Sequence, residues 1–180
     1  MIGIAFVVVR GPALSGKTTV ARRLAERLRG RVAVISQDDL WSRWIVGHDD
    51  DVAKEAELVY RQLKLLASTY IRGGYHIIVD ASFALYRDGA AALHESDLRE
   101  LLGLVSTVPN VRPLLVSLVA PLDTLRERMR DAEGAEEGAV EALQRAFAAS
   151  AMPSALELDT SALSPDEAVE RILERLGVSR

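Results

Sequence analysis

The sequence predicts an α/β protein built on a five-stranded parallel sheet with helices on both faces. Short apolar runs of strand length alternate with segments whose apolar residues recur at helical spacing. Strands that alternate with helices are joined by crossovers, which produce parallel sheets covered on both faces. The 180 residues, of which 49% are hydrophobic, suffice for one domain with a full core.

The strands are expected where apolar residues stand together between turn residues. These runs cover residues 4–9, 32–35, 76–79, 114–119 and 155–158. Ligands on such sheets bind at the carboxyl ends of the strands, so the residues after each run are the first candidates for a functional site.

Helical periodicity marks the segments between the strands. One face of the first helix is expected to carry Val20, Leu24 and Leu28. One face of the next is expected to carry Leu58, Leu65 and Leu66, with Val59 and Leu63 beside them. The last helix begins at a capping box, Ser164-Pro165-Asp166-Glu167, and Gly177 stands where its C-terminal stop belongs.

The most specific motif follows the first strand, where "GPALSGKT" fits the pattern G-x-x-x-x-G-K-[ST] and opens a helix. Its two glycines permit backbone angles at which successive N–H groups form an anion nest, and the helix N-terminus adds further N–H groups. Lys17 can then neutralise the β and γ phosphates, and the Thr18 hydroxyl can ligate Mg²⁺. A glycine-rich turn before a helix is the alternative. This context predicts a P-loop NTPase fold, with a nucleotide held by Gly11, Pro12, Ala13, Leu14, Ser15, Gly16, Lys17, Thr18 and Thr19.

Carboxylates follow two further strands. Asp38 and Asp39 come after the second strand, and Asp80 ends the third strand just before Ser82. An aspartate that ends an apolar strand beside a phosphate loop usually holds Mg²⁺ through water, so Asp80 is the candidate on the metal side. Asp38 is the candidate general base for an attacking hydroxyl. The alternative is a helix N-terminus at which one of Asp38 and Asp39 caps the helix and the other complements its dipole.

Five stretches together resemble a known family: "GPALSGKTT", "SQDDLW", "IIVDAS", "APLDTLRERMR" and "LDTSALSPDEAV". In this order and spacing they look like the P-loop kinases grouped with chloramphenicol phosphotransferase, the 5′-hydroxyl polynucleotide kinases and the zeta-toxin-type kinases. The resemblance implies that Asp38 is the general base and that Thr160 and Ser161 edge the adenine. Members often carry a phosphate-contacting arginine at the position of Trp41, which Arg43 lies close enough to replace.

The resemblance also implies a lid over about 124–140, whose arginines close over the triphosphate. Arg128 and Arg130 match the lid positions, and Gly134 and Gly138 are expected hinges. The alternative is a solvated helix in which Glu127 and Asp131 balance the arginines.

An acceptor cap is expected over about 41–72. Trp41 and Trp44 lie within four residues and offer a flat apolar face for a ring or an acyl group, or else anchor a helix to the core. Together with them, the expected acceptor-side residues are Asp38, Asp39 and Ser82. The residues expected to cap the following helix are Asp49, Asp50 and Asp51, with His48 at the surface.

Composition limits the remaining classes. A net charge of −4 argues against a protein that wraps nucleic acid, and zero cysteines exclude thiol chemistry. Three histidines at unrelated spacings make a zinc site unexpected, and no apolar run reaches membrane-spanning length, so a cytoplasmic protein is expected.

The sequence thus predicts a single kinase domain over residues 1–180 that uses ATP and Mg²⁺ to phosphorylate a hydroxyl of a small-molecule acceptor. Two alternatives remain open at this point. One is a 5′-hydroxyl polynucleotide kinase, and the other is a nucleotide-binding ATPase or regulatory module without an acceptor.

Overall fold

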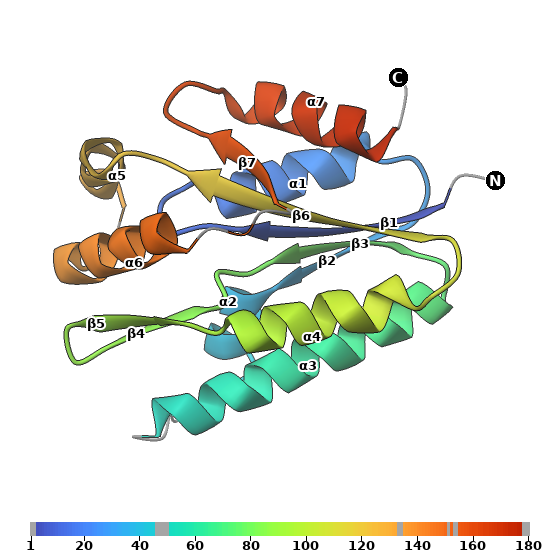
Figure 1. The fold of residues 1–180 in the computed structure, drawn as a ribbon, viewed down its shortest axis with the longest axis horizontal. Coiled ribbons are helices and arrows are strands. Elements are labelled where there is room, and N and C mark those ends of the chain that lie inside the picture. Colours follow the sequence, from blue (N-terminus) through green and yellow to red (C-terminus); the bar gives the residue numbers. More distant parts are fainter. Residues whose placement is uncertain (1–2, 46–50, 133–134, 151, 153–154, 178–180) are drawn as a thin grey trace.

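A five-stranded parallel sheet forms the centre of the computed structural model, which describes residues 3–45, 51–132, 135–150, 152 and 155–177. The strand order is β2-β3-β1-β6-β7 (Figure 1). The strands are β1 (Ile4–Arg10), β2 (Val32–Ser36), β3 (His76–Asp80), β6 (Val111–Val119) and β7 (Leu156–Asp159). All four pairings between these neighbours are parallel, as the alternation of strands and helices predicts.

Helices cover both faces of this sheet (Figure 1). Helices α1 (Lys17–Arg27) and α7 (Pro165–Leu176) cover one face, and α3 (Val52–Arg72) and α4 (Glu95–Ser106) cover the other. Helices α2 (Gln37–Ser42), α5 (Leu122–Met129) and α6 (Glu137–Ala149) lie toward the carboxyl ends of the strands (Figure 1). Strand β1 alternates between two cores: Phe6 and Val8 pack with α3 and α4, whereas Val7 and Val9 pack with α1 and α7. Because these four side chains are fully buried, β1 is the central strand that joins the two layers.

The five predicted strands are confirmed, and four of them agree with the structure to within one residue at each end. Strand β6 begins earlier, at Val111, because its pairing with β1 starts at Ile4 opposite Val111. Arg112 and Pro113 interrupt the apolar pattern there, so the sequence run begins only at Leu114.

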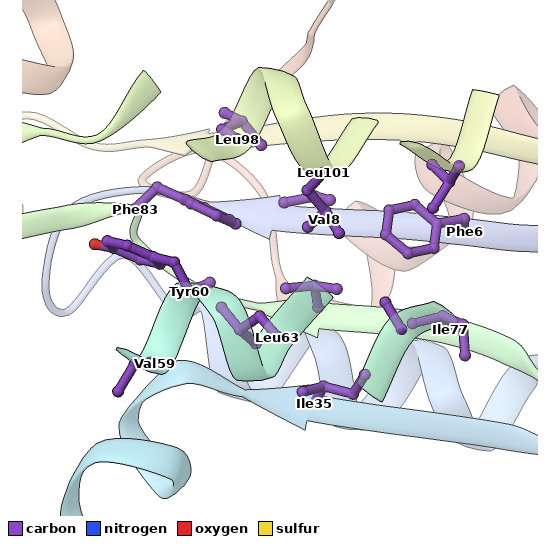
Figure 2. Packing of buried hydrophobic residues seen from close by; sticks show 14 of the residues in the cluster. Phe6, Val8, Ile35, Val59, Tyr60, Leu63, Ile77, Phe83, Leu98 and Leu101 are labelled. Carbon is purple, nitrogen blue, oxygen red and sulfur yellow. The ribbon is translucent and has the colours of Figure 1, made fainter. Parts of the chain in front are cut away.

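The expected apolar face of α3 is wrong in part. Leu58 and Leu65 are 45% and 68% exposed, whereas Val59, Tyr60 and Leu63 are buried. Figure 2 shows these three buried side chains beneath Val8 of the sheet and Leu101 of α4. The helix carries leucines on two faces, and the core face is set by a stripe that also uses small residues: Ala56, Val59, Tyr60, Leu63, Ala67 and Ile71.

An antiparallel hairpin, β4 (Ala84–Arg87) and β5 (Ala90–Leu93), was not among the predicted elements. Its two-residue turn is Asp88-Gly89, and both residues have positive φ, at 52° and 80°. An Asp-Gly pair is a strong hairpin signal, but the alanine-rich flanks lack the alternation that marks strands. The hairpin leaves the end of β3 and lies near α6 (Figure 1).

The predicted caps of α7 and α3 are present where the structure describes them. Ser164 and Glu167 form the capping box of α7, and Gly177 ends that helix with a φ of 67°. Asp51 caps α3 by accepting a hydrogen bond from the backbone N–H of Lys54. His48, Asp49 and Asp50 lie outside the described residues. Among the residues described, no helix is both long and apolar enough to cross a membrane.

Candidate active site at the carboxyl edge of the sheet

The loop between β1 and α1 is shaped to bring backbone close to a ligand. A Cβ atom at Gly11 would lie 2.5 Å from the Leu118 carbonyl oxygen and 2.6 Å from Ser15 Oγ, so only glycine fits there. Gly16 has a φ of 91° and precedes α1 without capping the helix through a side chain. The first N–H groups of α1 therefore keep their capacity to bind an anion. Ser15 Oγ is buried and has no hydrogen-bond partner among the described residues, which adds an unused polar group.

The lysine of the loop lies between carboxylates. Lys17 Nζ donates to the Pro12 carbonyl at 3.0 Å, so the side chain folds back along the loop. Burial lowers the pKa of Lys17, and the charges of Asp80 and Asp38 oppose that shift. A triphosphate bound in the loop would offer Lys17 a stronger partner than a carbonyl oxygen.

Thr18 and Asp80 form the predicted metal side of the site. Thr18 Oγ1 donates to Asp80 Oδ2 at 2.7 Å, and Asp80 is only 4% exposed. Burial raises the pKa of Asp80, whereas the Thr18 hydrogen bond and Lys17 lower it. A hydroxyl and a carboxylate in contact beside a phosphate nest fit a Mg²⁺ ion bound mainly by phosphate and water. In the described part of the chain, no group of three or more His, Asp and Glu side chains forms a metal site by itself.

Two hollows meet at this loop. The small hollow, of about 390 Å³, is lined by Leu14, Ser15, Gly16, Thr19, Val20, Arg128, Thr160, Leu163, Ser164, Pro165 and Ala168. The large hollow has a volume of about 690 Å³ and contains Lys17, Thr18 and Asp38. Its other walls come from Trp41, Val52, the β4–β5 hairpin, the segment before α6 and Leu143 of α6. Because both hollows include Leu14, Gly16 and Thr19, the phosphate loop is their common wall.

Helix α2 brings Asp38 to the large hollow. Ser36 caps this helix by accepting from the Asp39 backbone N–H at 3.2 Å, so neither aspartate is the cap. Asp38 is exposed in the first turn and lines the hollow. Asp39 instead pairs with Arg43 at 2.9 Å, one turn further along the exposed side of the helix. The alternative that one of the two aspartates caps α2 is therefore wrong, and both lie within its first turn.

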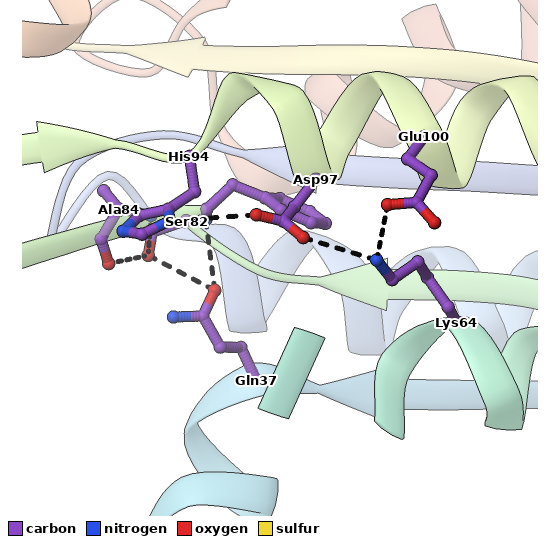
Figure 3. Close-up of polar contacts among 8 residues, drawn as sticks. Gln37, Lys64, Ser82, Ala84, His94, Asp97 and Glu100 are labelled. Carbon is purple, nitrogen blue, oxygen red and sulfur yellow. Dashed lines mark hydrogen bonds and ion pairs between the residues drawn. The ribbon is translucent and has the colours of Figure 1, made fainter. Parts of the chain in front are cut away.

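A buried glutamine fixes α2 to the segment that follows β3. Gln37 is 5% exposed, and its Oε1 accepts from the Phe83 backbone N–H at 3.1 Å and from Ser82 Oγ at 3.4 Å (Figure 3). Phe83 holds a φ of 51°, which is a strained conformation for a non-glycine residue. The expected acceptor-side residue Ser82 thus also serves the structure, since it connects Gln37 to the Ala84 carbonyl.

Side chains from α3 and from the start of α4 pack against this segment. The Phe83 ring stacks on Tyr60 at a centroid distance of 5.4 Å, and Tyr60 also meets the His94 ring at 5.0 Å. Asp97 then lies between His94, at 3.8 Å, and Lys64, at 3.3 Å, as Figure 3 shows. Burial raises the pKa of Tyr60 far above its usual range, so this phenol stays neutral.

The two tryptophans have different surroundings. Trp41 lines the large hollow and also packs against the core, so it anchors α2, and its contact with an acceptor stays a prediction. Trp44 is 64% exposed and is not among the residues that line either hollow. Among the described residues of the range 41–72, Trp41 and Val52 line the large hollow, and one face of α3 packs on the sheet.

The range predicted for the lid, about 124–140, includes most of α5 and the start of α6, and Gly134 lies outside the described residues. Arg126 of α5 joins the two helices through Glu137, at 3.4 Å, and Glu141 of α6, and it also pairs with Asp123 of its own helix at 3.6 Å. The carboxylates that balance this arginine are therefore not Glu127 and Asp131, which the solvated-helix alternative named. A small core of Ala120, Leu125 and Val140 packs against Ala13 and Leu14, so the lid contacts the tip of the phosphate loop.

The two candidate lid arginines lie in different places. Arg128 donates to the Leu14 carbonyl at 3.0 Å, to Thr160 Oγ1 at 3.0 Å and to the Thr160 carbonyl at 2.6 Å. It therefore forms a wall of the small hollow, beside Thr160. Arg130 is exposed at the end of α5. Ser161 hydrogen bonds to Asp159 Oδ1 through its backbone and its hydroxyl and is not among the residues that line the small hollow.

Several residues that line the large hollow were not predicted from the sequence. Leu85 and Tyr86 come from the hairpin, and Leu143 comes from α6. The Asp88-Gly89 pair would have revealed the hairpin, but nothing in the sequence marks Leu143 as a cavity residue rather than a core residue. Gln37 was also missed, since a glutamine beside two aspartates gives no sign that it is buried.

Comparison with known proteins identifies the family and the fold of the chain. A family model described as an AAA domain, AAA_33, matches residues 6–153. A search of curated proteins gives no match. An unliganded sugar kinase from Janibacter sp. HTCC2649 is 25% identical, with a TM-score of 0.64 over 98% of this chain and 96% of that one.

Two further solved structures share the fold at lower identity. The tunicamycin resistance protein of Deinococcus radiodurans is 21% identical, with a TM-score of 0.64 over 98% of this chain and 97% of that one. The Mycobacterium tuberculosis APS kinase CysC, in complex with AMPPNP and APS, is 21% identical, with a TM-score of 0.68 over 99% and 100%. The chain therefore belongs to the AAA_33 family of AAA domains and has the fold of the P-loop kinases, as its motifs predict.

Proposed function

We propose that the protein is an ATP- and Mg²⁺-dependent phosphotransferase that moves the γ-phosphate of ATP to a hydroxyl of a small-molecule acceptor. The observation that carries the proposal is the position of the phosphate loop between two hollows, with Lys17 and Asp38 on the side of the large one. A kinase needs two substrate sites that meet at the transferred phosphate, and a simple ATPase needs only one.

ATP is assigned to the small hollow and the loop. The base would lie against Arg128 and Thr160, whose hydrogen bonds form one wall, and the phosphates would extend along the loop toward Lys17. Lys17 would exchange its bond to Pro12 for the β and γ phosphates. Mg²⁺, held by Thr18 and through water by Asp80, would neutralise charge on the same phosphates.

The acceptor is assigned to the large hollow. Asp38 would accept the proton of the attacking hydroxyl, because its carboxylate lines the hollow that also holds Lys17. Trp41 and Ser82 would contact the acceptor from the same side. Arg130 would approach the phosphates when the lid, about 124–140, closes, and the acceptor cap of about 41–72 contributes its first residues.

A transfer screen with γ-labelled ATP tests this proposal. Nucleosides, sugars, hydroxylated antibiotics and 5′-hydroxyl oligonucleotides are incubated with the protein and Mg²⁺, and labelled products are separated. We expect label on a small molecule and strongly reduced labelling by the Lys17→Ala variant. Label on the oligonucleotides would identify a polynucleotide kinase. Hydrolysis of ATP that no acceptor increases would identify an ATPase module.

A further inference from the structure

Several apolar side chains line the large hollow, and most of them come from elements outside the phosphate machinery; together they are called its apolar wall. Leu85 and Tyr86 reach it from the hairpin, Leu143 from α6, Val52 from the start of α3 and Trp41 from α2. Alanines complete it before α6, at Ala132 and Ala135. Phosphates and the reacting hydroxyl need none of these side chains, so the wall is available to another part of the acceptor.

Charged side chains in this hollow are few. Among the described residues that line it, only Lys17 and Asp38 carry charge, and the proposed transfer uses both. Arg43 is paired with Asp39, and Arg126 with three carboxylates. Residues 46–50 and 133–134, which flank the lining segments in sequence, contain no lysine or arginine. An anionic acceptor would therefore lose water without gaining a cation of its own, and it would face Asp38.

Among the described residues that line the hollow, the remaining polar side chains are neutral. The Ser82 hydroxyl and the Tyr86 phenol line it, and the phenol lies 3.5 Å from Glu136 Oε1 on the lid side. Such groups can bind hydroxyl, ether or carbonyl oxygens of a ligand. A volume of about 690 Å³ suits a molecule of drug size rather than a polymer strand.

We infer that the acceptor is an uncharged molecule with its reacting hydroxyl at one end and an apolar body that packs on the hairpin and α6. This inference rests on the proposed function for the identity of the reacting end. The apolar wall, and the small number of cationic side chains in the large hollow, determine the chemical class of the rest of the acceptor. Phosphorylated and carboxylated acceptors are excluded by the same features.

A neutral fluorescent probe tests the wall without any transfer reaction. Prodan is titrated into the full-length protein with and without Mg·ATP, and fluorescence gives its Kd. Leu85→Asn and Leu143→Asn should each weaken prodan binding by about tenfold, because each places an amide on the apolar wall. Leu65→Asn is the matched control, since Leu65 is 68% exposed on the outer face of α3, and it should change nothing.

Unchanged Mg·ATP affinity in both hollow variants verifies that they are folded. Prodan binding that ignores both hollow substitutions, or that falls in the Leu65 control alone, would overturn the inference. A loss of prodan binding in the hollow variants supports it, whether or not the protein proves to be a kinase.

A matched pair of ligands tests the charge. Methyl 4-(hydroxymethyl)benzoate and 4-(hydroxymethyl)benzoate share the hydroxymethyl group and the ring, and only the second is an anion. The ester should displace prodan at a concentration about tenfold lower than the acid. Trp41→Arg adds a cation to the hollow, so it should reduce this tenfold difference between the two displacing concentrations. Equal displacement, or preference for the acid in the unmodified protein, would contradict the inference. Failure of all transfer while the ester still displaces prodan would instead count against the proposed kinase activity.

Discussion

Replacing Gln37 with alanine is expected to reduce both stability and turnover while leaving nucleotide binding intact. The side chain is 5% exposed, and its Oε1 accepts the Phe83 backbone N–H at 3.1 Å. Its contact with Ser82 Oγ, at 3.4 Å, is at the long limit of a hydrogen bond and contributes little. Gln37→Ala therefore leaves one buried backbone donor without a partner.

The cost follows from that single donor. A buried polar group that loses its partner costs about 1–3 kcal/mol, and we take about 2 kcal/mol for a neutral N–H. For a domain of this size, that corresponds to a decrease in Tm of about 4–8 °C. Phe83 has a φ of 51°, which is a strained conformation. We expect the loop to relax to a different conformation when the hydrogen bond between Phe83 and Gln37 is lost. The neighbouring Asp38 would then lose its position, which should lower kcat by about 10- to 100-fold.

Thermal unfolding, calorimetry with Mg·ATP and initial-rate kinetics measure the three effects separately. Gln62→Ala is the matched control, since Gln62 Oε1 is buried with no hydrogen-bond partner in the described residues and lies outside both hollows. It should change stability by less than about 0.5 kcal/mol. The reasoning is refuted if Gln37→Ala melts at the temperature of the unmodified protein, or if its kcat is unchanged despite the lower Tm.

Four further predictions concern the phosphate site. Lys17→Ala should lower kcat by roughly 30- to 1,000-fold in label-transfer assays, because a charge interaction of about 2–4 kcal/mol with the transferred phosphate is lost. The circular dichroism spectrum of the variant should be unchanged. An unchanged kcat would contradict this prediction. In Mg²⁺ titrations of activity, Asp38→Asn should lower kcat alone, whereas Asp80→Asn should also raise the Mg²⁺ requirement; reversed phenotypes would exchange the two roles. Without Mg²⁺, Asp80→Asn should melt higher than the unmodified protein at neutral pH. Burial raises the folded-state pKa of Asp80 above its ordinary value of 3.8, so ionisation of Asp80 destabilises the folded protein as pH rises through that raised pKa. The difference in Tm between Asp80→Asn and the unmodified protein should therefore shrink as pH falls toward 3.8. A Tm of Asp80→Asn below that of the unmodified protein at every pH would be inconsistent with this prediction. Steady-state kinetics should show Arg128→Ala raising the KM for ATP and Arg130→Ala lowering kcat, since only Arg128 lines the small hollow; equal effects of both substitutions would argue against the division.

The sequence predicts the phosphate side of this site far better than the acceptor side. The loop from Gly11 to Thr18 and the carboxylate of Asp80 are dictated by local backbone requirements and by strand ends, which a pattern of residues records directly. The walls around the acceptor depend on tertiary packing between distant segments. Leu143 and Leu85 lie 58 positions apart, and no local pattern distinguishes a leucine that lines a cavity from one that fills a core.

The apolar face of α3 illustrates the same limit. Leucine spacing alone favours Leu58 and Leu65 as core residues, but alanines allow the helix to approach the sheet closely on another face. The alternative that an aspartate caps α2 failed for a related reason. Ser36 ends a strand and also caps the helix, so the cap lies two residues before Asp38 and three before Asp39.

The hairpin is joined to the rest of the fold at a single narrow base, where the His94 backbone N–H donates to the Phe83 carbonyl at 2.7 Å. Its chain thus leaves and re-enters the domain at almost the same point, after β3 and before α4. A segment attached in this way can change in length and composition during evolution without displacing the strand that carries Asp80 or the loop that carries Lys17. Under the proposed function, exchange of this one short insertion would change the part of the acceptor site that Leu85 and Tyr86 line and would leave the phosphate loop in place.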